Sequence, residues 1–151
     1  VMFASGDLIF GVIFILLSGI CDVIDGAIAR SHNRQSKFGG FLDSVCDRFA
    51  DAAIIVGLVI GGYIGPILGV LAVHSAMTVS YVRSRAENEG IKCSVGIAER
   101  AERLIIIVVG ALIAAACGNS HNIMFMTIVI LTILSYITVL QRVYHTWNNL
   151  K

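Results

Sequence analysis

Eight residues between positions 22 and 47 have types and spacing that suit metal-dependent phosphate chemistry. They are Asp22, Asp25, Gly26, Ala29, Arg30, Gly39, Asp43 and Asp47. Four carboxylates this close repel one another unless a cation holds them together, and their oxygens suit hard ions such as Mg²⁺ or Mn²⁺. Asp22 and Asp25 share one face of a helix because they are three residues apart. Asp43 and Asp47, four apart, share a face of the next helix, so we expect two facing pairs at one metal pocket.

The other four residues of this segment suit a bound nucleotide. Gly26 removes a side chain where a phosphate could approach the backbone, and Ala29 keeps the same face shallow. Arg30 can bind a phosphate, and Gly39 permits close approach as the second helix begins. Two divalent ions could clamp a diphosphate here and stabilise charge on its bridging oxygen. The alternative is a solvated helix end whose acids pair with nearby arginines and lysines. This alternative does not explain why the acidic pairs of both helices would point toward one pocket.

The composition is that of a membrane protein. The 151 residues are 57% hydrophobic and only 14% charged, and the mean hydropathy is +0.86. Apolar runs cover residues 8–21, 52–61, 67–82, 104–117 and 123–140. Several are shorter than the roughly 20 residues of a span, so their helices must extend into charged segments. We therefore predict one all-α domain over residues 1–151, a polytopic transmembrane helical bundle with five visible spans.

The basic residues predict the orientation of this bundle. All 11 lysines and arginines lie around residues 30–48 and 83–103 or at the C-terminus, and the turns at 61–66 and 118–121 contain none. The positive-inside rule makes the charged side cytoplasmic. The chain begins at Val1 without an initiator Met. We therefore expect that an upstream span is missing and that the native protein has six.

The eight residues fit the pattern D-x-x-D-G-x-x-A-R-x8-G-x3-D-x3-D without a mismatch. In this pattern, and over all visible spans, the chain resembles the CDP-alcohol phosphotransferase family of membrane enzymes. By this resemblance, we expect the family's first membrane helix to be the part that is missing here. The resemblance implies a multi-pass homodimer in the cell membrane with six helices per chain and a polar cavity that faces the cytoplasm.

The resemblance also implies roles for the eight residues. Asp22, Asp25 and Asp43 would hold one metal ion, and Asp47 would complete a two-metal site for Mg²⁺ or Mn²⁺. The CDP group would contact Asp22, Asp25, Gly26, Ala29, Arg30, Gly39 and Asp43. Asp47 would also be the general base, in agreement with chemistry, because an alcohol that attacks phosphorus must lose its proton to a group within reach. CMP would then leave.

A second set of residues points to an anionic acceptor. Arg83, Arg85, Arg100 and Arg142 lie at the same side as the aspartates, and guanidinium groups bind phosphate through paired donors. We predict that these four bind the phosphate of a phosphorylated alcohol. The alternative is ordinary positive-inside charge, together with helical pairs such as Glu99–Arg103.

Two motifs narrow the acceptor. Y-V-R-S-R-A-E and E-R-A-E-R-L, together with L-D-S-V-C-D-R-F-A-D, resemble the branch that uses inositol 1-phosphate, the archaetidylinositol phosphate and phosphatidylinositol phosphate synthases. Ala101 stands where relatives often have Pro, a position before a helix that tolerates the change. The donor would be CDP-archaeol or CDP-diacylglycerol, embedded in membrane lipid. No nucleic-acid partner is expected.

Three other functions remain open from the sequence. A phosphatidylglycerophosphate-type synthase shares the eight-residue signature and uses glycerol 3-phosphate. A cation transporter would place its acids within interrupted spans rather than at helix ends. A non-catalytic membrane scaffold would bind neither metal nor nucleotide. Outside these motifs, His74 in an apolar run is expected to hydrogen-bond to a neighbouring helix.

Overall fold

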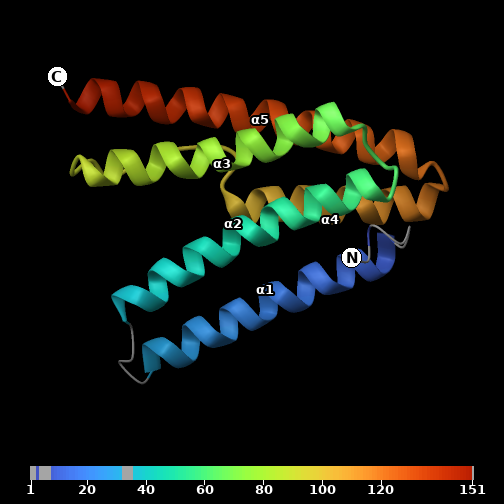
Figure 1. The fold of residues 1–151 in the computed structure, drawn as a ribbon, viewed down its shortest axis with the longest axis horizontal. Helices are drawn as coiled ribbons and strands as arrows, with labels where there is room; N and C mark the ends of the chain where they lie inside the picture. Colours follow the sequence, from blue (N-terminus) through green and yellow to red (C-terminus); the bar gives the residue numbers. More distant parts are fainter. Residues whose placement is uncertain (1–2, 4–7, 32–35, 151) are drawn as a thin grey trace.

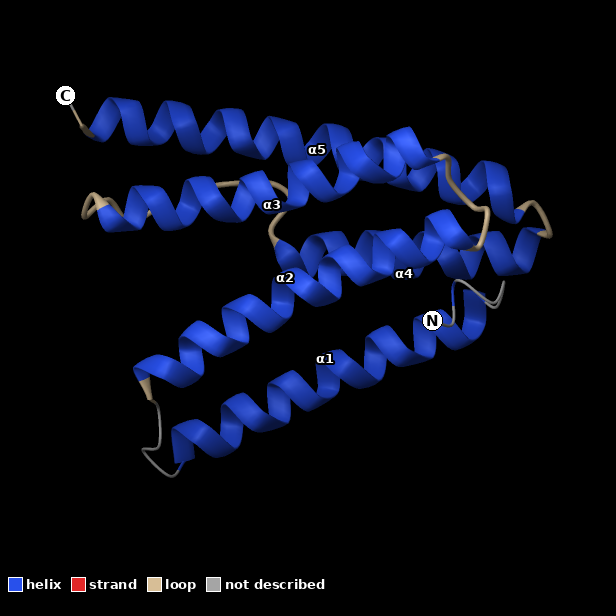
Figure 2. Cartoon of the chain, in the orientation of Figure 1, coloured by secondary structure: helices blue, strands red, loops and turns tan. Residues whose placement is uncertain are grey.

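The protein is a bundle of α-helices. The computed structural model describes residue 3 and residues 8–31 and 36–150, with side chains described at 3, 8–19 and 36–150. Within these ranges the chain forms five helices and no strand (Figures 1 and 2). The helices are α1 (Leu8–Ser31), α2 (Lys37–Ile60), α3 (Pro66–Asn88), α4 (Arg100–Cys117) and α5 (Ser120–Asn149). The all-helical prediction is confirmed.

The helices extend beyond the apolar runs, as predicted. α1 continues for ten residues past the run that ends at residue 21. α2 begins at Lys37, where Ser36 caps it by accepting a hydrogen bond from the Gly39 amide at 2.9 Å. Such a cap satisfies one of the unpaired amides of the first turn. Both acid pairs of the signature therefore lie inside helices rather than in the connection between them.

Glycine and proline mark the other ends. α2 stops before Gly62, whose φ of 74° falls in the left-handed region that favours glycine, and Pro66 opens α3 at its first turn. Gly118, with φ of 67°, ends α4 in the same way. His121 also hydrogen-bonds to the Gly62 carbonyl at 3.0 Å, so the two turns are tied together.

Among the described helices, α5 makes the most extensive packing contacts. α5 packs against both α3 and α4, while α1 contacts α4 and α2 contacts α3. The side chains of Leu58, Met124 and Ile128 are fully buried in the resulting core. Between α3 and α5, His74 Nδ1 and the Tyr136 hydroxyl are 2.9 Å apart, which confirms the expected interhelical bond.

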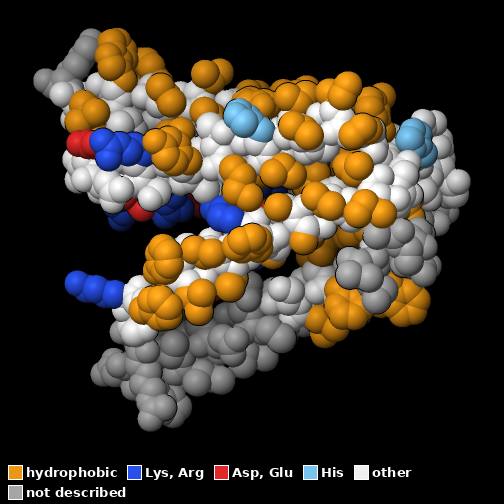
Figure 3. Space-filling view, viewed as in Figure 1, with side chains coloured by type: hydrophobic (Ala, Val, Ile, Leu, Met, Phe, Trp, Pro, Cys, Tyr) orange, Lys and Arg blue, Asp and Glu red, His pale blue; other side chains and the backbone are white. Residues whose placement is uncertain are grey.

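The outer surface is unusually apolar. Large hydrophobic side chains are exposed on every helix, with Phe49 73% exposed and Ile67 79% (Figure 3). Patches of this extent on a water-soluble monomer would be a liability, so they indicate contact with lipid or protein. Within the described residues, α3 and α5 are each long and apolar enough to cross a membrane. Residues Leu8–Gly19 of α1 form a shorter apolar segment.

Small residues allow α4 and α5 to approach closely. A Cβ added at Gly110 of α4 would clash with the Thr127 side chain of α5. We expect Gly110→Ala to destabilise the protein by about 1–3 kcal/mol, the usual cost of overpacking a filled contact. A Cβ at Gly40 meets no described atom within 4 Å.

Gly40→Ala is therefore the matched control. It should be neutral or stabilise α2 by up to about 1 kcal/mol, because alanine favours a helix over glycine. Thermal unfolding in detergent micelles measures both variants. Equal unfolding temperatures for the two would contradict the close α4–α5 contact.

Candidate functional site

A polar cavity of about 500 Å³ opens at one end of the bundle. The N-terminal halves of α2 and α4 and the C-terminal halves of α3 and α5 surround it (Figure 1). Figure 3 shows a hollow at this end with Lys and Arg side chains along it. Its lining residues are Ser44, Asp47, Arg48, Val79, Ser80, Arg83, Ser84, Glu87, Glu99, Arg100, Ala101, Glu102, Arg103 and Arg142. The two charged segments of the sequence thus meet at one place.

Asp47 and Arg100 form an ion pair in the lining of this cavity. Asp47 Oδ1 and Arg100 Nη1 are 2.7 Å apart, and Arg48 Nη2 lies 3.8 Å from Asp47 Oδ2. Both side chains of the closer pair are partly exposed, at 19% for Asp47 and 26% for Arg100. Asp43 lies one turn before Asp47 on α2 and is exposed. A predicted base and a predicted phosphate ligand therefore share one cavity.

The first aspartate pair belongs to α1. The side chains of Asp22, Asp25, Gly26, Ala29 and Arg30 lie outside the described residues, but their backbone is helical. α1 and α2 are consecutive and run antiparallel (Figure 1). Asp25 stands six residues before the end of α1, and Asp43 stands six residues after the start of α2. At a rise of about 1.5 Å per residue, the two positions have similar heights along the bundle.

The donor set fits a hard divalent ion. Asp43 and Asp47 supply two carboxylates from one face of α2, and the helix registers put Asp25 and Asp22 at matching heights on α1. Oxygen donors of this kind are what Mg²⁺ and Mn²⁺ prefer. The described part of the chain has no group of three His, Cys, Asp or Glu residues placed to hold a metal ion. A complete site would therefore need the α1 pair.

The four predicted arginines differ in whether they line the cavity and in how exposed they are. Arg83 is 45% exposed and lines it, with Nε 2.9 Å from Glu87 and Nη1 3.9 Å from Glu99. Arg85 pairs instead with Glu89 at 2.6 Å on the exposed side of α3 and is not among the cavity residues. The structure therefore brings Arg83 to the site and leaves Arg85 outside it.

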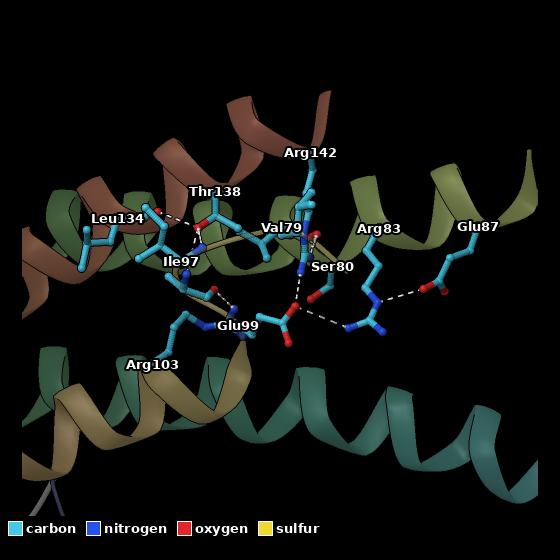
Figure 4. Close-up of polar contacts among 12 residues, drawn as sticks. Val79, Ser80, Arg83, Glu87, Ile97, Glu99, Arg103, Leu134, Thr138 and Arg142 are labelled. Carbon is cyan, nitrogen blue, oxygen red and sulfur yellow. Dashed lines mark hydrogen bonds and ion pairs between the residues drawn. The ribbon is translucent and has the colours of Figure 1, made fainter. Parts of the chain in front are cut away.

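Arg142 is placed differently again. It is only 2% exposed, and its three donor nitrogens each have a protein acceptor (Figure 4). Nε donates to the Val95 carbonyl at 2.7 Å, and Nη1 donates to the Val79 carbonyl at 2.8 Å. Nη2 donates to Glu99 at 2.9 Å. Arg142 thus borders the cavity while it joins α5 to α3 and to the segment before α4.

That segment, residues 89–99, is attached to α5 at further points. The Thr138 hydroxyl accepts hydrogen bonds from the amides of Ile97 and Ala98, at 3.2 and 3.0 Å. Gly96, with φ of 140°, allows the backbone to pass against α5, and a Cβ there would lie 2.5 Å from Thr138 Cγ2. These contacts fix the wall of the cavity from which Glu99 and Arg100 project.

The structure adds a buried ion pair that the sequence did not single out. Arg103 Nη2 lies 2.6 Å from Asp51 Oδ2, and both side chains are at least nine-tenths buried. Arg103 also donates to the Ala98 carbonyl, and Arg100 Nε reaches Asp51 at 3.5 Å. The helical pair Glu99–Arg103, considered above as an alternative, does not form because each residue pairs elsewhere. Asp51 follows Asp47 by one helical turn on the same face, and this spacing was the feature of the sequence that could have identified Asp51 as part of the site.

An apolar groove of about 530 Å³ lies between α1 and α2. Its residues are Phe3, Gly11, Phe14, Ile15, Ser18, Ala50, Ala53 and Ile54. Ser18 on α1 is one turn from Asp22, and Ala50 on α2 is one turn from Asp47. The groove therefore ends next to the aspartate level of both helices.

The chain belongs to the CDP-alcohol phosphatidyltransferase family, since residues 1–140 match the sequence model of that family. The archaetidylinositol phosphate synthase of Methanothermobacter thermautotrophicus is 50% identical over 151 residues, which is 99% of this chain and 75% of that protein. The Pyrococcus horikoshii synthase of the same name is 39% identical over 140 residues, 92% of this chain and 70% of the relative. The resemblance inferred from the signature is confirmed.

Solved structures of a further relative have the same fold. Phosphatidylinositol phosphate synthase of Mycobacterium tuberculosis with CDP-DAG bound matches at a TM-score of 0.86 and 29% identity, over 97% of this chain and 77% of that one. The same enzyme in complex with manganese and citrate matches at 0.85, over 97% and 74%. A divalent metal is therefore part of the chemistry of this family, as predicted.

The buried ion pair of Asp51 and Arg103 can be tested by mutation. Asp51→Asn leaves the Arg103 charge buried without its counter-ion, which typically costs about 3–5 kcal/mol. Replacement of both residues, as Asp51→Leu with Arg103→Met, removes the charge altogether and should cost much less. Thermal unfolding of the two variants checks this order. A double variant less stable than Asp51→Asn would contradict the role assigned to the pair.

Proposed function

We propose that the chain transfers a phosphatidyl-type group from a CDP-lipid to inositol 1-phosphate and releases CMP. The observation that carries this is the placement of Asp47 and Arg100 in one cavity, 2.7 Å apart. A base for the acceptor hydroxyl and a cation for the acceptor phosphate are both needed there. Relatives that are inositol phosphate synthases of archaea and bacteria support the same reaction.

The residues suggest the course of the reaction. A hydroxyl of the acceptor attacks the phosphorus that carries the lipid, and its proton passes to the Asp47 carboxylate. The bond from this phosphorus to the bridging oxygen breaks, and CMP leaves with the electron pair. Divalent metal held by Asp22, Asp25, Asp43 and Asp47 would supply charge stabilisation for the diphosphate. Gly26, Ala29, Arg30 and Gly39 would border the CDP group, as the signature implies.

The acceptor phosphate would bind between Arg83 and Arg100. These two predicted arginines line the cavity with partly exposed guanidinium groups. The first turn of α4, which begins at Arg100 and has no side-chain cap, adds a favourable dipole. Arg142 is buried with its donors in use, so we assign it a supporting rather than a direct role. Arg85 is left outside this assignment.

We also propose that the five helices span a cell membrane as a multi-pass bundle, with the cavity on the cytoplasmic side. The exposed apolar surface and the basic residues at the cavity end support this orientation. A homodimer is proposed from the family's usual assembly. The exposed ring pair of Phe38 and Phe41 on α2, with centroids 6.3 Å apart, belongs to a surface that a second chain or lipid could cover.

Asp47→Asn tests the base. The amide cannot accept the proton as a carboxylate does, so CMP release should fall by about 10²–10⁴-fold. Glu89→Gln is the control, because Glu89 pairs with Arg85 away from the cavity. Release of CMP would be followed with purified protein, CDP-lipid, inositol 1-phosphate and Mn²⁺. An Asp47→Asn variant as active as the control would remove Asp47 from the base role.

An acceptor panel tests the substrates. The protein would receive CDP-archaeol or CDP-diacylglycerol, each with inositol 1-phosphate, glycerol 3-phosphate or serine. We expect CMP release with inositol 1-phosphate and its loss when EDTA removes the metal. The higher identity to archaeal synthases supports CDP-archaeol as the better donor. Preference for glycerol 3-phosphate would replace this proposal with the phosphatidylglycerophosphate-type reaction, and cation flux without CDP-lipid would indicate a transporter.

A further inference from the structure

Glu99 directly precedes α4 and borders the cavity. It is the N-cap of α4, yet its side chain does not cap the helix amides. Instead it extends away from α4 toward α3 and α5, where it borders the cavity and remains 37% exposed (Figure 4). An N-cap acceptor normally stabilises the first turn. The Glu99 carboxylate does not cap the first turn of α4 and is hydrogen-bonded to Arg142 instead.

One oxygen of Glu99 is held firmly. Oε1 accepts from Arg142 Nη2 at 2.9 Å and lies 3.9 Å from Arg83 Nη1. Figure 4 shows the other oxygen turned toward α2, the wall of the cavity that carries Asp47. Among the described residues this second oxygen has no hydrogen-bond partner. Arg142 thus holds one oxygen of the carboxylate, and the other oxygen can accept a hydrogen bond from a ligand in the cavity.

The chemistry of a carboxylate limits what this acceptor can bind. An ionised carboxylate has no proton to donate, so it repels a phosphate group and accepts only from donors such as hydroxyls. Arg83 and Arg100, which line the same cavity as Glu99, suit the phosphate of the acceptor. Inositol 1-phosphate carries five hydroxyls, and glycerol 3-phosphate carries two. A polyol ring bound by its phosphate would present hydroxyls to the remaining acceptors of the cavity.

We propose that Glu99 determines specificity for a polyhydroxylated acceptor, by accepting a hydrogen bond from a ring hydroxyl that does not react. This rests on the proposed function, because it presumes that a phosphorylated polyol enters the cavity. The polar acceptor at Glu99 also disfavours substrates without a matching hydroxyl. A site built around such a hydrogen bond discriminates strongly, since its polar group is left unpaired when the hydroxyl is absent.

Arg142 is the positioning residue for Glu99. Its guanidinium is buried and is fixed by the carbonyls of Val79 and Val95, so the direction of its third donor is set by α3 and by the segment before α4. That donor holds Glu99 at 2.9 Å. Hydrogen bonds that involve a charged group are stronger and more directional than neutral ones. Arg142 would therefore affect acceptor binding indirectly, because it positions Glu99.

The test pairs Glu99→Gln with a series of acceptors that each lack one ring hydroxyl. For the wild type, one deoxy position should lower kcat/KM by about 10- to 100-fold, the usual range for a hydrogen bond to a charged group. In Glu99→Gln the amide oxygen is a weaker acceptor than the carboxylate, so the parent acceptor should lose part of this factor, and removal of the same hydroxyl should then cost correspondingly less than in the wild type. KM for the CDP-lipid should stay unchanged. Glu89→Gln should behave as the wild type at every position.

A purely structural role for Glu99 predicts a different pattern. The variant would then lose the same factor with every acceptor, with no coupling to one hydroxyl, and that result overturns the proposal. Wild-type protein that releases no CMP with inositol 1-phosphate but does so with glycerol 3-phosphate overturns the proposed function and this inference together. If Glu99→Gln does not fold, Glu99→Asp, which keeps the charge on a shorter side chain, is judged by the same coupling.

Discussion

Two buried arginines hold the start of α4 in place, and the polar cavity depends on them. Arg142 reaches from α5 to the carboxylate of Glu99, and Arg103 reaches from α4 to Asp51 on α2. A buried guanidinium is costly unless its donors are used and its charge is compensated, so each of these contacts must be kept. Together they fix the junction of three helices from which Arg100 meets Asp47.

The arrangement divides the basic residues into two groups by burial. Arg103 and Arg142 are almost fully buried, and their guanidinium groups donate hydrogen bonds to protein acceptors. Arg83 and Arg100 are partly exposed in the cavity, where their charges can reach a ligand. Charge in an otherwise apolar bundle thus joins helices at the buried arginines, and at the exposed ones we propose that it binds an anion. The proposed reaction needs both, because an acceptor and a CDP-lipid must be held in fixed relation while one proton moves.

Much of this could be predicted from the sequence, and the rest could not for physical reasons. Pro66, Gly62 and Gly118 mark breaks by their restricted or permissive backbones, so the helix ends followed directly. The spacing of Asp43 and Asp47 predicted a shared helix face, and both lie four residues apart in α2. By contrast, Arg83 and Arg142 are the same residue type near helix ends, and only the tertiary packing makes one accessible and the other buried. The partner of Arg103 likewise depended on how α2 and α4 meet.

The most direct measurement is an experimental structure of the protein with inositol 1-phosphate and Mn²⁺ bound. The phosphate should lie within ion-pair distance of Arg83 and Arg100, with a ring hydroxyl within hydrogen-bond reach of Asp47. The metal should lie among the aspartates of α1 and α2. An acceptor phosphate bound at those aspartates, or outside the cavity altogether, would contradict the proposed roles of Arg83, Arg100 and Asp47.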